Sequence, residues 1–357
     1  MSSAVASLRT LVIATLLAGL LPSPAGAQSV PFDSLYSFGD SFSDTGNVLA
    51  GTKTIGLDPA IPPSESPHAT YYKGRFSNGP LAVEYLWQHL TGNAPGTRGG
   101  LQPILASPRY GLNRAIDFAF GGTGTPHLDQ TPGGFWAPGL KGQVDLFRTV
   151  LRGRKPSKRA LYVIATGWND YRLDEFNVPM APPDVVSNIV EAVSTLYELG
   201  ARHVMVFDVP DPAFLPGGDS GGSGTMVAAW HNELLGQELT ALAGRHPDLN
   251  IIPVHLNQLF PQLSGMGFEV STPALALLMP NPGPFGVPAY QCLFVLPEAC
   301  QDANFDVIGQ LGVPFVYWDV VHPTTDAHRV LGQFLHDELN RSVAAAAPGR
   351  ANARRER

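Results

Sequence analysis

The fold is decided by a stretch near the N-terminus, Tyr36-Ser37-Phe38-Gly39-Asp40-Ser41-Phe42-Ser43-Asp44-Thr45-Gly46-Asn47. Residues 35–38 predict a short buried strand, and this strand stops at the corner formed by Gly39, Asp40 and Ser41. Open α/β sheets place their chemistry at the carboxyl ends of their strands. The sequence therefore predicts that the corner presents the Ser41 hydroxyl at such an edge, where it is a candidate nucleophile.

Short apolar runs alternate with segments of helical periodicity along the rest of the chain. This alternation favours an α/β fold in which the strands pair in parallel. Strands are predicted at residues 35–38, 115–120, 160–165, 203–207 and 250–254, and helices at residues 79–90, 184–199, 225–243 and 324–339.

A candidate base and an orienting acid lie near the other end of the chain, in Asp319-Val320-Val321-His322-Pro323-Thr324. A serine is a weak nucleophile until a base takes its proton, and His322 is suited to that role. Pro323 favours an extended backbone at His322, just before the last predicted helix. Asp319 precedes His322 by three residues, close enough across a turn to hold one ring nitrogen. An Asp-x-x-His pair alone is a weak signal, because most such pairs are structural.

Two further segments offer hydrogen-bond donors for the oxyanion that develops in acyl transfer. Residues 119–124, Ala-Phe-Gly-Gly-Thr-Gly, follow a predicted strand, and their glycines allow a backbone N–H to approach a substrate closely. Residues 167–170, Gly-Trp-Asn-Asp, follow the strand at 160–165, so the Asn169 amide can project over the same edge. Taken singly, the first segment is equally an ordinary turn, and the second an Asn that satisfies its own loop.

Together and in this order, the four segments resemble the sequence blocks of the GDSL lipase/esterase family, also called SGNH hydrolases. The first block is matched by Gly39-Asp40-Ser41 with Ser43-Asp44-x-Gly46-Asn47, and residues 117–122, 167–170 and 319–324 resemble the others. Residues 74–79, Gly-Arg-Phe-Ser-Asn-Gly, resemble a stretch of the lipase-like branch. The family usually has Asn where Asp117 stands. The resemblance spans residues 35–340.

This resemblance implies a flavodoxin-like three-layer α/β/α sandwich with a central parallel sheet of about five strands. It implies that Ser41 is the nucleophile, that His322 is the base and then the acid, and that Asp319 orients His322. No cofactor and no metal is expected to take part. The oxyanion hole is implied to consist of the backbone N–H groups of Ser41 and Gly122 and the side chain of Asn169, with Gly121 as the alternative to Gly122.

A second serine hydrolase signature surrounds Ser220 in residues 217–222, Gly-Gly-Asp-Ser-Gly-Gly, which contain the Gly-x-Ser-x-Gly pattern of α/β-hydrolases. That pattern needs a strand directly before the serine, but Pro210, Pro212 and Pro216 intervene after the strand at 203–207. The segment is therefore predicted to be a flexible loop. Two other classes stay open: a non-catalytic binding protein on a hydrolase fold and, less plausibly, a metal-dependent hydrolase, because the histidines lack ligand spacing.

The first residues predict a signal peptide at 1–27, with Arg9 as its positive flank, an apolar run at 11–21 and a small-residue cleavage site ending at Ala27. Cleavage there would leave one hydrolase domain at 28–341 and a disordered tail at 342–357, in a secreted or periplasmic protein. No later segment is long and apolar enough to cross a membrane, although transient contact with a membrane surface is compatible with the sequence.

The net charge limits the kinds of binding partner that the protein can have, and the cysteines bear on the cellular compartment in which it works. The formal net charge of −7 argues against a nucleic-acid surface. Cys292 and Cys300 are the only cysteines, and they lie in one proline-rich stretch of a chain that is expected to be exported. This placement predicts a local disulfide that closes a loop.

The expected function is that of a secreted serine ester hydrolase that acts on small-molecule or lipid esters through an acyl-serine. The first block and residues 74–79 favour acyl or phospholipid esters and lipid degradation. A carbohydrate acetylesterase or an acyltransferase would use the same residues. Aromatic side chains that can line an acyl pocket, stack on sugars or merely pack are Tyr71, Tyr72, Trp136, Trp168, Phe285 and Tyr290.

Overall fold

The computed structural model describes residues 32–106, 114–131, 134–172, 178–216, 218, 221–278 and 291–352. The predicted signal peptide, Ser220, Phe285 and Tyr290 lie outside these ranges. The strands are β1 (Ser34–Gly39), β2 (Gln102–Pro103), β3 (Ala115–Asp117), β4 (Asp129–Gln130), β5 (Trp136–Ala137), β6 (Ala160–Ala165), β7 (His203–Phe207) and β8 (Asn250–Val254). The helices are α1 (Asn47–Thr54), α2 (Ala82–Thr91), α3 (Leu140–Leu151), α4 (Pro182–Leu199), α5 (Ser223–Arg245), α6 (Leu256–Gly265), α7 (Ala274–Leu278), α8 (Cys292–Val295) and α9 (Thr325–Asn352).

The central sheet has six strands in the order β2-β3-β1-β6-β7-β8, and every neighbouring pair is parallel. Leaving out the two-residue β2, the order of the five longer strands in chain terms is 2-1-3-4-5, which is the flavodoxin-like doubly wound arrangement. All five predicted strands are therefore present, although the one predicted at residues 115–120 ends at Asp117. The short β2 and the separate antiparallel pair β4-β5 were not predicted.

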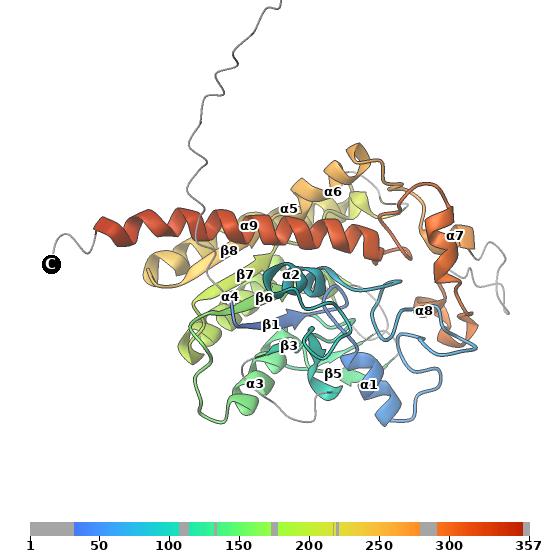
Figure 1. The fold of residues 1–357 in the computed structure, drawn as a ribbon, viewed down its shortest axis with the longest axis horizontal. Helices are drawn as coiled ribbons and strands as arrows, with labels where there is room; N and C mark the ends of the chain where they lie inside the picture. The colour runs from blue at the N-terminus through green and yellow to red at the C-terminus, as the bar shows by residue number, and fades with distance from the viewer. Residues whose placement is uncertain are drawn as a thin grey trace, which may run out of the picture.

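Alternate residues of the central strands face opposite helical layers, so the sheet is buried on both sides. In β1, Tyr36 and Phe38 pack with residues of α3, α4 and α5. Leu35 packs instead with residues of α2, α6 and α9. Figure 1 shows α9 running along α2 above the sheet, with α3 below it. The predicted three-layer sandwich is confirmed.

The segments that follow β1 and β6 lie side by side at the centre of the sheet, where the strand order reverses. The chain leaves β1 toward β3 on one side and leaves β6 toward β7 on the other, so a crevice opens beyond Gly39 and Ala165. The Gly39 backbone is fixed from α3: its N–H donates to Gln143 Oε1, and its carbonyl accepts from Gln143 Nε2, both at 2.8 Å. Ser41 and Asn169 follow these two strand ends.

The close approach of β1 and β6 requires a glycine at position 39. The φ of Gly39 is +144°, and an added Cβ would lie 2.0 Å from the carbonyl oxygen of Ala165. Gly39→Ala is therefore expected to lower the free energy of unfolding by about 3 kcal/mol or more, from backbone strain together with overpacking. Urea unfolding at equilibrium measures this.

The matched control for that substitution is Gly236→Ala in the exposed part of α5, where a Cβ meets no atom within 4 Å. It is expected to raise stability by about 0.5–1 kcal/mol, because glycine is unfavourable inside a helix. Equal effects of the two substitutions would contradict the close-approach argument.

The C-terminal segment differs from the sequence prediction. A disordered tail was expected at 342–357, but α9 continues to Asn352, and only 353–357 lie outside the described residues. The prediction gave weight to proline and arginine, whereas the alanines at 344–347 are strong helix formers that extend the helix. In the part of the chain that the structure describes, no helix combines the length and apolarity needed to cross a bilayer.

Candidate active site

Ser41 lies in the turn that directly follows β1, and its side chain reaches a cavity of about 280 Å³. Asp40 builds this turn, since its Oδ1 accepts from the N–H of Phe42 at 3.0 Å and its carbonyl accepts from the N–H groups of Ser43 and Asp44, both at 3.0 Å. Burial raises the pKa of Asp40 to about 7. The turn therefore fixes the backbone on either side of the Ser41 hydroxyl.

His322 enters the same cavity from the segment before α9. Its Nδ1 lies 2.7 Å from Oδ2 of Asp319, which is fully buried behind the ring. Phe76 and Phe294 pack against the imidazole, with ring centroids 5.2 and 5.8 Å away. Because Nδ1 is bonded to the carboxylate, Nε2 is the nitrogen left for proton exchange in the cavity.

Asp319 is stabilised as a carboxylate although it is buried. Its Oδ1 accepts from the N–H groups of Val321 and His322 at 2.9 and 2.8 Å, and its Oδ2 also accepts from the Tyr71 hydroxyl at 2.6 Å. Burial raises the pKa of Asp319, but His322, Tyr71 and Val321 outweigh burial and hold that pKa below its ordinary value.

The glycine-rich segment after β3 meets the cavity at Gly121 and Gly122. The Gly121 N–H donates to Oδ2 of Asp44 at 2.9 Å, so this donor is already engaged. Gly122 has a φ of +80°, in the left-handed region. A Cβ on Gly121 would lie 2.1 Å from the Phe76 ring, the ring that packs on His322.

Asn169 begins the short 3-10 helix η2 (Asn169–Tyr171) after β6, and its side chain lines the cavity. Its Nδ2 donates to the carbonyl oxygen of Thr123 at 3.0 Å. Its Oδ1 accepts from Nη1 of Arg172 at 3.1 Å, and the same Nη1 donates to the carbonyl of Gly122 at 3.0 Å. The guanidinium thus determines which end of the Asn169 amide is the donor, and the second Nδ2 hydrogen is left for the cavity.

Asp117, where the family usually has Asn, lies beside the cavity and not in its wall. Its Oδ2 accepts from the N–H and Oγ1 of Thr45 at 2.7 and 2.9 Å, and its Oδ1 accepts from the N–H of Ala119 at 2.9 Å. Burial and the neighbouring Asp44 raise the pKa of Asp117 well above its ordinary value. Asp117 therefore ties the segment before α1 to the end of β3.

The structure brings the predicted site residues together. Ser41, Gly122, Asn169 and His322 line one cavity, and Asp319 holds His322 from behind. The rest of the wall is largely apolar, as in most pockets that bind small molecules. Its apolar members include Phe42, Ile61, Phe76, Phe135, Trp168, Leu215, Phe260, Leu293 and Phe294.

The chain as a whole also matches a known protein family. Residues 35–335 match the family model described as GDSL-like lipase/acylhydrolase. The chain belongs to this family. It is an ester hydrolase, and the resemblance stated from the sequence is confirmed.

Several curated proteins are similar to this GDSL-like chain. Acetylajmalan esterase 2 of Rauvolfia serpentina is 27% identical, over 87% of this chain and 91% of that protein. A GDSL esterase/lipase of Arabidopsis thaliana is 24% identical, over 85% and 88%. The phosphatidylcholine-sterol acyltransferase of Aeromonas hydrophila is 30% identical, over 58% and 55%. Among solved structures, a family two carbohydrate esterase from Clostridium thermocellum matches with a TM-score of 0.41 at 14% identity, over 88% of this chain and 65% of that chain.

For the aromatic residues of this GDSL-like hydrolase, the sequence left open whether they line an acyl pocket, stack on sugars or merely pack. Of the aromatic residues that the sequence suggested and the structure describes, Trp168 lines the cavity, whereas Tyr71, Tyr72 and Trp136 do not. Tyr71 is buried against Asp319, and Trp136 is mostly exposed on β5. The other aromatic side chains of the cavity wall were not predicted, and they come from separate loops and helices: Phe42, Phe76, Phe135, Phe260, Phe294 and Tyr317.

Cys292 and Cys300 form the predicted disulfide, with an S–S distance of 2.08 Å. It closes a loop that contains α8, and Leu293 and Phe294 of this helix line the cavity. Within the described ranges, no group of three or more His, Cys, Asp or Glu side chains is arranged to hold a metal ion.

Proposed function

We propose that this ester hydrolase is an exported enzyme that cleaves esters of apolar acyl chains through an acyl intermediate on Ser41. The observation that carries the proposal is one cavity that contains Ser41, His322 and Asn169. Asp319 is bonded to the far side of the imidazole. This arrangement supplies a nucleophile, a base, an orienting acid and an oxyanion donor.

In the first half-reaction, His322 Nε2 takes the proton of Ser41 Oγ while Oγ bonds to the carbonyl carbon of the ester. The oxyanion accepts hydrogen bonds from the N–H of Ser41, the N–H of Gly122 and Asn169 Nδ2. We favour Gly122 over Gly121 because the Gly121 N–H is engaged by Asp44. The ester C–O bond then breaks, and the imidazolium gives its proton to the departing alcohol.

In the second half-reaction, a water molecule gives its proton to His322 Nε2 as its oxygen bonds to the acyl carbon. The bond from that carbon to Ser41 Oγ breaks, and Oγ recovers the proton. The products are the carboxylic acid and free enzyme. An alcohol in place of water would give acyl transfer by the same steps.

A panel of p-nitrophenyl esters of increasing acyl length tests the substrate class. A buried CH₂ contributes about 0.8 kcal/mol, so kcat/KM should rise about fourfold per methylene until the cavity is full. Phospholipids and acetylated oligosaccharides extend the panel, and an added alcohol tests acyl transfer. Fastest turnover on acetyl esters of sugars would overturn the apolar-acyl proposal. Secretion is tested by the mature N-terminus, which should be Gln28.

Asn169→Ala is expected to lower kcat by about 10²- to 10³-fold with little change in KM, because the lost donor acts on the developing oxyanion. Steady-state kinetics on the best ester of the panel measure it. Asn188→Ala is the matched control, since Asn188 Nδ2 donates to Thr125 Oγ1 at 3.0 Å and does not line the cavity. Similar losses in both variants would mean that Asn169 acts only by holding its loop.

A further inference from the structure

Tyr71 is a buried tyrosine, 1% exposed, and its hydroxyl points at the acid of the proposed triad. That hydroxyl donates to Asp319 Oδ2 at 2.6 Å. The same oxygen lies 2.7 Å from His322 Nδ1. Tyr71 and the imidazole therefore share one carboxylate oxygen, and Tyr71 approaches it from a loop 248 residues earlier in the chain.

The two oxygens of Asp319 have separate partners. Among the described residues, Oδ1 accepts only from backbone N–H groups, those of Val321 and His322, which lie in the same turn as Asp319. Oδ2 accepts the Tyr71 hydroxyl and the His322 ring. Because the backbone partners belong to its own turn, Tyr71 is the contact that ties the carboxylate to another part of the molecule. It also withdraws negative charge from the oxygen that faces the imidazole.

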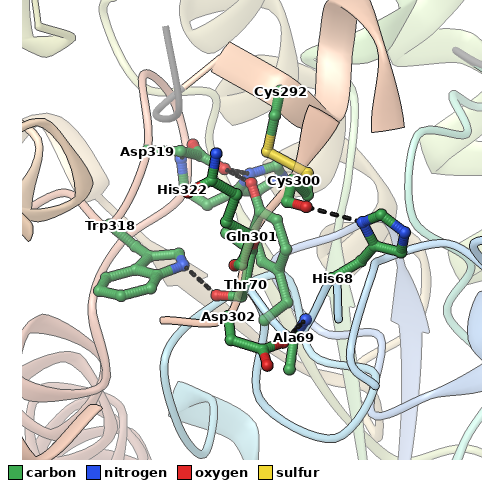
Figure 2. Close-up of a disulfide and its surroundings, with 11 residues drawn as sticks. His68, Ala69, Thr70, Cys292, Cys300, Gln301, Asp302, Trp318, Asp319 and His322 are labelled. Carbon is green, nitrogen blue, oxygen red and sulfur yellow. Dashed lines mark hydrogen bonds and ion pairs between the residues drawn. A yellow bond between two sulfur atoms is a disulfide. The ribbon is translucent and has the colours of Figure 1, made fainter. Parts of the chain in front are cut away.

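The loop that carries Tyr71 is attached to the chain beyond the disulfide. His68 Nδ1 lies 2.7 Å from the carbonyl oxygen of Cys300, and the Ala69 N–H donates to Asp302 Oδ1 at 2.8 Å (Figure 2). Thr70 Oγ1 donates to the carbonyl of Gln301 at 2.7 Å. The Thr70 carbonyl accepts from Trp318 Nε1 at 3.2 Å, one residue before Asp319.

We propose that Tyr71 is a positioning residue of the triad, which fixes Asp319 Oδ2 on His322 Nδ1 and moderates how strongly the carboxylate holds the imidazolium. Tyr71 is held in place by the hydrogen bonds between residues 68–70 and residues 300–302. The Cys292–Cys300 disulfide anchors this second segment. Tyr71 does not line the cavity, so it acts through Asp319 and not on the substrate. The inference rests on the proposed function of Ser41, His322 and Asp319.

Other titratable groups surround the Asp319–His322 pair and must be kept constant in a test. Asp40 approaches His322 from the turn after β1, and His328 approaches it from the first turns of α9. Burial raises the pKa of Asp40 to about 7 and lowers the pKa of His328 to about 3. Neither group contacts Tyr71 in the hydrogen bonds of the described residues, so a substitution at Tyr71 leaves both in place.

The test compares Tyr71→Phe with Tyr162→Phe. Tyr162 is also fully buried, on β6, and its hydroxyl has no hydrogen-bond partner in the described part of the chain. Tyr71→Phe is expected to lower kcat by roughly ten- to hundredfold, the range for a hydrogen bond to a charged group, with KM nearly unchanged. Tyr162→Phe is expected to leave both constants unchanged.

The pH dependence of kcat/KM distinguishes the proposed role of Tyr71 from a merely structural one, because a loss of packing around Tyr71 would not shift it. Without the Tyr71 hydroxyl, the carboxylate holds the proton of the pair more strongly, so the acid limb of kcat/KM should move to higher pH in Tyr71→Phe. An unmoved acid limb, or a kcat equal to that of Tyr162→Phe, would overturn the inference. Ser41→Ala distinguishes failure of the proposed function from failure of the role of Tyr71. If Ser41→Ala keeps activity, the proposed function is wrong. If Ser41→Ala is inactive while Tyr71→Phe is normal, only the role of Tyr71 is wrong.

The anchoring by the disulfide is tested with the double variant Cys292→Ser, Cys300→Ser. It should lower kcat and move the acid limb in the same direction as Tyr71→Phe, and it should add little further loss when combined with Tyr71→Phe. Full additivity of the two losses would mean that the disulfide loop acts on another part of the site, such as Phe294 against His322.

Discussion

Ser41→Ala is expected to lower kcat for ester hydrolysis by about 10⁴-fold or more, the scale on which removal of a triad nucleophile acts. Ser41 lies at the carboxyl end of β1 in a cavity that also contains His322 and Asn169. Without Oγ no acyl-enzyme forms, and only binding and the oxyanion donors remain. Turnover of the best p-nitrophenyl ester measures the loss, and thermal unfolding should show a protein as stable as the wild type.

The chain offers a close control for this substitution. Ser43 lies two residues further on and is fully buried, and its hydroxyl has no hydrogen-bond partner among the residues that the structure describes. Ser43→Ala should therefore keep nearly full activity. An organophosphonate probe should add its mass to the peptide that contains Ser41 in the wild type and in Ser43→Ala. Labelling that survives in Ser41→Ala, or activity lost only in Ser220→Ala, would assign the nucleophile to the other serine motif.

The residues of the proposed triad were predictable because their types and positions are local properties of the sequence. The chain must turn at a serine that directly follows a strand, and again at an Asp-x-x-His that precedes a helix. Both turns can be located without knowing which residues pack around them. Parallel pairing of β1 with β6 then puts Ser41 and Asn169 on one sheet edge. The same reasoning predicted the five longer strands of the central sheet, because each is a short apolar run, and β1, β3 and β6 are buried along their whole length.

The partners of the triad were not predictable, because they depend on contacts between irregular segments. Tyr71 reaches Asp319 across 248 residues, and Arg172 fixes Asn169 from the end of a short 3-10 helix. Neither position is part of a strand or helix period, so the sequence contains no signal of which way these side chains point. The donor to the oxyanion shows the same limit: only the hydrogen bond from the Gly121 N–H to Asp44 distinguishes the two adjacent glycines.

Asp319→Asn is expected to lower kcat by about 10⁴-fold while KM changes little, because the substitution changes the tautomer of His322. Two backbone N–H groups, of Val321 and His322, donate to Oδ1. In the variant, these two N–H groups require the amide oxygen at the position of Oδ1. The NH₂ group must then occupy the position of Oδ2, 2.7 Å from His322 Nδ1. An NH₂ group donates, and it therefore stabilises the imidazole that has its proton on Nε2.

That tautomer cannot act as the base, since Nε2 must accept the proton of Ser41 Oγ. The loss should therefore persist at every pH at which the protein stays folded, instead of moving with the acid limb as in Tyr71→Phe. Asp208→Asn is the control, because Asp208 is a second buried aspartate that lies 3.4 Å from a histidine, His255, but does not line the cavity. It should keep kcat within a few-fold of the wild type. If Asp319→Asn also kept its kcat, the carboxylate would have no part in the chemistry, and His322 would have to be oriented by its ring contacts with Phe76 and Phe294 alone.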